Sequence, residues 1–255
     1  MPERADSHAR APQVVVLTNL GMRGDYGLLR LTWPKHIPNL NPGHALQLHT
    51  PAIDAVTCAP LFRCDPRGDW CEVLYRSPSA LSQCKPTESI GCSGVIGNEM
   101  SSTFTTPQKT LLLGSGLGLA PIVFFADLLR QRRQHRQSIA LLEFDDEAPF
   151  VATPSRILLP TVPNGVIACM PLLEDWGIAS RLASTTDQPG TFDGGVLALA
   201  DHVLGQLRRD NASAIAFVVA GTDEFVEQFS MLREKYRIQP ERVQVCALAY
   251  TITNQ

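Results

Sequence analysis

The chain has 255 residues, of which 44% are hydrophobic and 18% are charged, enough for a substantial core in one large domain or two small ones. Its formal net charge of -3 excludes a general electrostatic attraction to nucleic acid or to anionic membranes. No apolar run approaches the length that a membrane-spanning helix requires. We therefore expect no nucleic-acid partner and no membrane span.

The first twelve residues are polar and include Arg4, His8 and Arg10. They lack the apolar middle region of a secretory signal, so residues 1–12 are predicted to be a short disordered tail of a cytoplasmic protein. Because the cytoplasm is reducing, the seven cysteines are expected to be thiols rather than disulfides.

From Gln13 to Ser101, short apolar runs alternate with glycine and proline. Four of these runs predict strands: Gln13–Asn19, Tyr26–Trp33, Ala45–His49 and Trp70–Tyr75. Short strands separated by regular turn signals are typical of an antiparallel barrel or sandwich.

From Lys109 onward, apolar segments of strand length alternate with longer amphipathic ones. The predicted strands are Thr110–Leu113, Ser138–Phe144, Val166–Met170, Ile178–Ser184, Ala214–Ala220 and Arg242–Ala249, and the predicted helices are Pro121–Arg133, Val196–Arg208 and Thr222–Tyr236. This alternation predicts a parallel sheet covered by helices. The polar segment Ser101–Gln108 is the predicted boundary, which gives a barrel domain over residues 13–101 and an α/β domain over residues 109–255.

A glycine-rich loop follows the first strand of the α/β half, in the segment Lys109–Pro121 (KTLLLGSGLGLAP). Gly114, Ser115, Gly116 and Gly118 stand where a strand turns into a helix, and glycines there let a diphosphate approach the backbone N–H groups at the helix N-terminus. The spacing differs from the usual Gly-x-Gly-x-x-Gly fingerprint, so a tight turn without a ligand is the alternative.

Three acidic residues close the second strand of this half: Glu143, Asp145 and Asp146. A carboxylate at this place can bind the ribose of a dinucleotide. A solvated turn is the alternative interpretation, and it is the one we favour.

The order of several segments resembles one known family, the electron-transfer subunit of dihydroorotate dehydrogenase, within the ferredoxin-reductase superfamily. The matching segments are Pro42–Leu48, Cys71–Ser82, Gly94–Met100, Leu112–Pro121, Thr186–Val196 and Val219–Phe229. The resemblance covers nearly the whole chain, and the glycine loop is its best match. It implies an antiparallel flavin-type barrel followed by a parallel-sheet nucleotide-binding domain.

The resemblance also implies a function in pyrimidine biosynthesis. Members of the family take a hydride from NADH onto FAD and pass electrons through a 2Fe-2S cluster to a partner subunit that carries the dihydroorotate site. The positions that the resemblance assigns to cofactor binding are Gly114, Ser115, Gly116, Gly118 and Gly221 for the nicotinamide nucleotide, and Pro60, Tyr75 and Ser79 for FAD. No catalytic residue is assigned.

The flavin motif of the family departs most from this sequence. Its Arg-Pro-x-Ser pattern stands here as Ala59-Pro60-Leu61-Phe62, so the cation that pairs with the FAD diphosphate and the hydroxyl that contacts the ring are both missing. Arg63 follows directly, but strand alternation turns it to the opposite face from its neighbour. The phosphate clamp that follows is reduced to Ser77-Pro78-Ser79, in which Pro78 has no N–H group.

The iron-sulfur motif of the family is also missing, because four cysteine ligands are required and only Cys246 stands near the end of this chain. Five other cysteines fall close together, without the spacing of a zinc or cluster site: Cys58, Cys64, Cys71, Cys84 and Cys92. We expect buried or incidental thiols there, with iron or zinc as the minority alternative, and therefore neither a 2Fe-2S cluster nor a metal.

Two functions remain open from the sequence. The first is an NAD(P)H-dependent flavin oxidoreductase subunit that passes electrons to a partner oxidoreductase. The second is a non-catalytic scaffold or nucleotide-binding accessory subunit without a redox centre. The lost motifs favour the second, whereas the preserved architecture and glycine loop favour the first, which is the function we expect.

Overall fold

A computed structural model describes residues 11–50, 56–101, 109–186, 188–207 and 215–248. The first part of the chain forms a closed antiparallel barrel with the strand order β1-β2-β5-β4-β3-β6. Its strands are β1 (Gln13–Gly21), β2 (Tyr26–Thr32), β3 (Ala45–His49), β4 (Val56–Cys64), β5 (Trp70–Arg76) and β6 (Ser89–Ile96). A short 3₁₀ helix, η1 (Ala80–Gln83), lies between β5 and β6.

The second part is a six-stranded parallel sheet with the order β12-β11-β8-β7-β13-β14. Its strands are β7 (Lys109–Ser115), β8 (Ser138–Glu143), β11 (Ala179–Ser184), β12 (Phe192–Asp193), β13 (Ile215–Gly221) and β14 (Val243–Ala247). Every residue of β13 is buried, as expected for a parallel strand with both faces covered.

The helices of this part are α1 (Leu119–Gln131), α2 (Pro171–Asp175), α3 (Val196–Gln206) and α5 (Asp223–Lys235). The hydroxyl of Thr222 accepts a hydrogen bond from the N–H of Phe225 and so caps α5. Two further short strands, β9 (Thr153–Pro154) and β10 (Ala168–Cys169), form a separate antiparallel pair beside the sheet.

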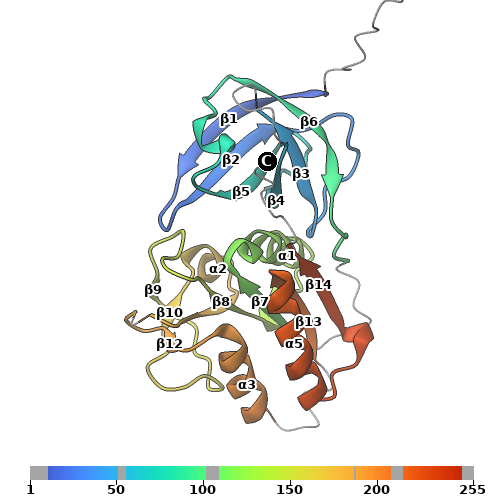
Figure 1. Cartoon of the computed structure of the whole chain (residues 1–255). Helices are drawn as coiled ribbons and strands as arrows, with labels where there is room; N and C mark the ends of the chain where they lie inside the picture. Colours follow the sequence, from blue (N-terminus) through green and yellow to red (C-terminus); the bar gives the residue numbers. More distant parts are fainter. Residues whose placement is uncertain (1–10, 51–55, 102–108, 187, 208–214, 249–255) are drawn as a thin grey trace, which may run out of the picture.

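Helix α1 lies between the barrel and the sheet (Figure 1). One side of it, including Ile122 and Phe125, packs over the sheet in a cluster that also contains Tyr26 and Phe62 of the barrel. Phe124, on another side of α1, belongs to the core of the barrel itself. A helix that is apolar on most sides is buried on most sides, and here that burial joins the two halves through continuous apolar packing.

The predicted fold class is confirmed: a six-stranded antiparallel barrel is followed by a parallel sheet covered by helices. The predicted third strand of the parallel sheet, Val166–Met170, was wrong, because only Ala168 and Cys169 form a strand and they pair with β9 instead. Strands β4 and β6 of the barrel were not predicted. Residues 1–10 and 102–108 lie outside the described part of the chain, so the tail and the domain boundary stay predictions.

Within the described residues, no helix combines the length and the apolar character needed to cross a membrane.

Candidate functional site

The glycine loop lies at the carboxyl edge of the parallel sheet, between β7 and α1. Gly114 of β7 is aligned with Ala220 of β13 on one side, and Ser115 is aligned with Glu143 of β8 on the other. Because all these strands are parallel, the loops after β7, β8 and β13 meet at one edge, which is the usual place for ligands in open α/β sheets. The structure thus brings Gly114–Gly118 together with Gly221.

Two glycines of the loop are required for different physical reasons. Gly116 has φ +55°, a left-handed conformation that residues with a Cβ adopt only at a cost. Gly118 packs against the backbone of Ala220 and Gly221, and a Cβ there would overlap the Ala220 carbonyl. The loop is therefore held tightly against β13 at Gly118 and has an unusual backbone direction at Gly116.

The N-terminus of α1 fits an anionic group. The loop continues through a 3₁₀ turn, Gly116–Gly118, into the 13 residues of α1. No side chain among the described residues caps α1, and its first turn holds no acidic residue, so no carboxylate of that turn compensates the positive end of the helix dipole. Ser115, Gly116 and Leu117 are partly exposed, which leaves the loop open to solvent.

The three acidic residues after β8 differ in their contacts. A carboxylate oxygen of Glu143 accepts a hydrogen bond of 2.6 Å from the N–H of Val196 and so caps α3. Asp145 and Asp146 are exposed, and the side chain of Gln188 donates to the Asp146 carbonyl. Of the three, only Asp145 and Asp146 keep their carboxylates available for a ribose hydroxyl.

The barrel residues assigned to FAD by the resemblance lie in other surroundings. Tyr75 points into the barrel core, and its hydroxyl donates to the side chain of Asn19 at 2.8 Å. Pro60 is buried in β4 and is aligned with Ala45 of β3. Ser79 precedes η1, and its buried hydroxyl has no hydrogen-bond partner among the residues that the structure describes.

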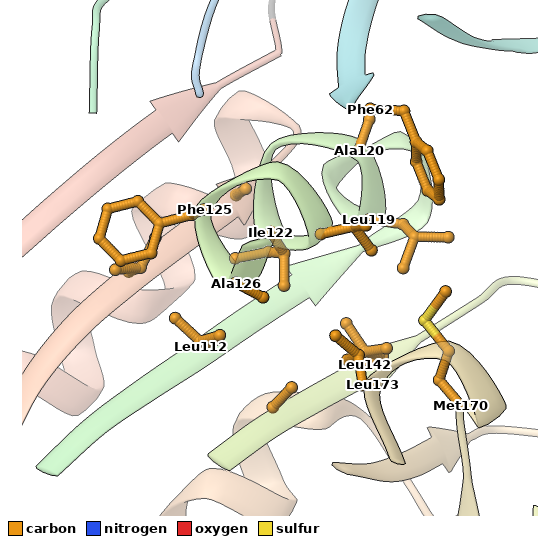
Figure 2. Close-up of a cluster of buried hydrophobic side chains, with 14 of the residues drawn as sticks. Phe62, Leu112, Leu119, Ala120, Ile122, Phe125, Ala126, Leu142, Met170 and Leu173 are labelled. Atoms are coloured by element: carbon orange, nitrogen blue, oxygen red, sulfur yellow. The ribbon is translucent and has the colours of Figure 1, made fainter. Parts of the chain in front are cut away.

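The segment Ala59–Phe62, which occupies the position of the family's flavin motif, is packed inside the protein. Ala59 is fully buried, and Phe62 is 4% exposed in the cluster that joins barrel and sheet. Figure 2 shows Phe62 beside Ala120 and Leu119, at the first turn of α1. Arg63 pairs with Glu72 at 2.9 Å. The register shift between Leu61 and Arg63 interrupts the expected strand alternation at this place. These residues do not fit a flavin: no cation faces the junction from β4, and an aromatic ring stands in place of the expected hydroxyl.

Two barrel residues near the glycine loop were missed from the sequence. Tyr26 begins β2, and its buried hydroxyl lies beside Gly116; Arg76 ends β5 and stacks over the Tyr26 ring, with its guanidinium carbon 4.5 Å from the ring centroid. No sequence pattern indicates that a tyrosine hydroxyl will be buried without a hydrogen-bond partner, so Tyr26 could not be identified in advance. The pairing of Tyr26 with Arg76 across β2 and β5 brings both to the loop.

The cysteines are all free, and all except Cys58 are buried. Burial raises the pKa of the Cys71 and Cys64 thiols, and it raises that of Cys246 to about 11. Such thiols stay protonated and unreactive at neutral pH. No group of metal-ligand side chains suited to an ion occurs among the residues that the structure describes.

Comparison with solved structures identifies the fold. The chain is similar to the Amycolatopsis cytochrome P450 reductase GcoB, with a TM-score of 0.71 and 14% identity over 92% of this chain and 68% of the other. It is similar to the FAD/NAD-binding domain of nitric oxide dioxygenase from Vibrio cholerae, with a TM-score of 0.67 and 11% identity over 92% and 98%. Phthalate dioxygenase reductase, described as transferring electrons from pyridine nucleotides to a [2Fe-2S] centre, gives a TM-score of 0.66 and 14% identity over 95% and 69%.

No family model matches the sequence, and no curated protein matches it. The architecture is that of the ferredoxin-reductase-like proteins, which pair a barrel with a nucleotide-binding sheet. Identities of 11–14% extend this conclusion to the fold and no further.

Proposed function

We propose that this chain is a nicotinamide-nucleotide-binding subunit of a cytoplasmic electron-transfer oxidoreductase and works with a partner oxidoreductase. The observation that carries the proposal is the glycine loop, whose Gly116 adopts φ +55° where β7 turns, through a 3₁₀ turn, into a helix N-terminus without a side-chain cap. That geometry suits a diphosphate, which gains hydrogen bonds from backbone N–H groups and favourable interaction with the helix dipole.

The names of the similar structures support an electron-transfer role. One is a cytochrome P450 reductase and another transfers electrons from pyridine nucleotides. The segment resemblance points more narrowly to the electron-transfer subunit of dihydroorotate dehydrogenase, with a dihydroorotate-oxidising subunit as partner. In that narrower form of the proposal, FAD would accept a hydride from NADH and pass on electrons.

A specific observation favours a second candidate, an accessory subunit that binds the nucleotide and has no redox centre of its own. Phe62 and Ala59, at the positions that the resemblance assigns to flavin contacts, are buried in apolar packing. Because these residues do not fit the flavin, we assign no chemical step through a flavin to this chain. The nucleotide would then be presented to an acceptor held by the partner.

Calorimetry with NADH and NADPH tests the shared part of both candidates. Wild-type protein should bind one of them, and Gly116→Val should not, because the side chain would stand where the phosphate must approach. Gly68→Val is the matched control: Gly68 also has positive φ (+77°), and a Cβ there meets only Trp33, in a turn of the barrel between Asp65 and Asp69. Absence of binding by the wild-type protein would refute the proposal.

An absorption spectrum of the purified protein, before and after incubation with FAD, separates the two candidates. Flavin absorbance that remains with the protein after gel filtration supports the flavin-dependent subunit. A colourless protein that binds NAD(P)H but retains no FAD supports the accessory subunit.

A further inference from the structure

Tyr26 carries a polar group that the folded chain does not satisfy. The residue is 2% exposed, and its hydroxyl has no hydrogen-bond partner within the described structure. Its ring packs edge-on against Phe144 with centroids 6.2 Å apart, and the guanidinium of Arg76 covers a ring face. A buried hydroxyl without a hydrogen-bond partner destabilises a protein. Such a group is therefore a candidate for binding a ligand.

The hydroxyl is aimed at the glycine loop. A Cβ built on Gly116 would meet one atom within 4 Å beyond its chain neighbours, the Tyr26 hydroxyl oxygen at 3.8 Å. The face of Gly116 is therefore open except on the side where this hydroxyl stands. A phosphate oxygen held over that face could accept a hydrogen bond from Tyr26.

The charges around Tyr26 suit an anionic ligand on one side and sugar hydroxyls on the other. Arg76 is positive, and so is the N-terminus of α1, which has no side-chain cap. Asp145 and Asp146 are close enough to influence Tyr26, but they are exposed and follow β8, where a ribose would lie. Burial is the largest influence and raises the pKa of Tyr26, whereas the nearby Arg76 guanidinium lowers it. The net shift is upward, so the hydroxyl keeps its proton at neutral pH and is available as a donor.

We propose that Tyr26 and Arg76 of the barrel complete the phosphate site of the glycine loop, so that both domains hold the nucleotide. Tyr26 donates a hydrogen bond to a phosphate oxygen, and Arg76 positions the Tyr26 ring and adds positive charge. This inference rests on the proposed nucleotide binding at Gly116 and adds a recognition element contributed by the other domain.

Tyr26→Phe tests the inference because it removes only the hydroxyl. We expect NADH affinity to fall about tenfold or more, the usual effect of losing a hydrogen bond to a charged group. The melting temperature without nucleotide should stay equal or rise, since an unpaired buried hydroxyl has been removed. Tyr236→Phe is the matched control: its hydroxyl is bonded to Asp201, so that variant should lose stability and bind NADH as the wild type does.

Arg76→Met gives a second test, because methionine keeps apolar packing on the Tyr26 ring without the charge. NADH binding should weaken and become less sensitive to salt, since salt screens the charge–phosphate attraction.

The outcomes separate the two proposals. If wild type and Tyr26→Phe bind NADH equally, the role of Tyr26 is refuted and the loop site stands. If Tyr26→Phe loses stability and affinity together, the hydroxyl is structural and the inference is again overturned. If the wild-type protein binds neither NADH nor NADPH, the loop site fails and the inference fails with it. Weaker binding at unchanged or higher stability supports it.

Discussion

Gly118 packs against the backbone carbonyl of Ala220 so closely that a Cβ on residue 118 would overlap the carbonyl oxygen. The contact joins the start of α1 to the carboxyl end of β13, at the edge of the sheet where the glycine loop lies. Gly116, two residues earlier, has room for a Cβ but an unfavourable φ of +55°. Packing thus requires a glycine at position 118, whereas the backbone conformation favours a glycine at position 116.

Gly118→Ala should therefore lower the free energy of unfolding by about 1–3 kcal/mol, the usual cost of forcing extra volume into packed structure. Gly116→Ala should lower it by about 1–2 kcal/mol through the left-handed backbone alone. Urea denaturation measures both. An unchanged stability in Gly118→Ala would contradict the close contact between α1 and β13.

Glu143 caps helix α3. Its carboxylate accepts the N–H of Val196 at the start of α3. Glu143→Gln removes the negative charge at a helix N-terminus and should cost about 1 kcal/mol of stability. Nucleotide affinity at the glycine loop should not change, which calorimetry can check. A large loss of nucleotide affinity in a stable Glu143→Gln variant would show that Glu143 takes part in nucleotide binding.

Phe62 should behave as a core residue. It is 4% exposed and packs with Leu119 and Ala120 of α1 (Figure 2). Phe62→Ala should lower the free energy of unfolding by about 3–5 kcal/mol, because the truncation loses buried apolar surface and leaves a cavity. Phe62→Leu is the control and should cost less than about 1.5 kcal/mol. Losses under about 1 kcal/mol in Phe62→Ala would indicate a loosely packed position, as a place meant for a cofactor ring would be.

The sequence predicted the α/β half better than the barrel, and the reason is local. The strand, the glycine loop and the start of the helix lie within the 13 residues from Lys109 to Pro121, so their pattern is continuous. Strand β4 was missed because Pro60 lies in its middle, and proline is disfavoured inside a sheet. The barrel accommodates it with a register shift between Leu61 and Arg63, on the side of β4 that faces β5.

The relation between Tyr26 and Gly116 could not be read from the sequence. The two residues are far apart along the chain, and they meet only because α1 holds the barrel against the sheet. Val166–Met170 was wrongly predicted as a strand of the parallel sheet for the same kind of reason. All its apolar side chains except that of Ile167 are buried, but only Ala168 and Cys169 pair with another strand, and that strand is β9. Local patterns identify elements, whereas their contacts depend on packing between distant segments.

Tyr236 should make stability sensitive to alkaline pH. Its hydroxyl donates to the Asp201 carboxylate at 2.8 Å, and burial followed by this carboxylate raises the pKa of Tyr236 from 10.0 to about 12. Because the folded-state pKa is above the unfolded-state value, this stabilisation is complete below about pH 10 and is lost as the pH rises towards about 12. Urea denaturation of wild type and Tyr236→Phe across this range should show the stability difference between them shrinking. Other alkaline titrations affect both proteins alike, so a constant difference would contradict the Tyr236–Asp201 interaction.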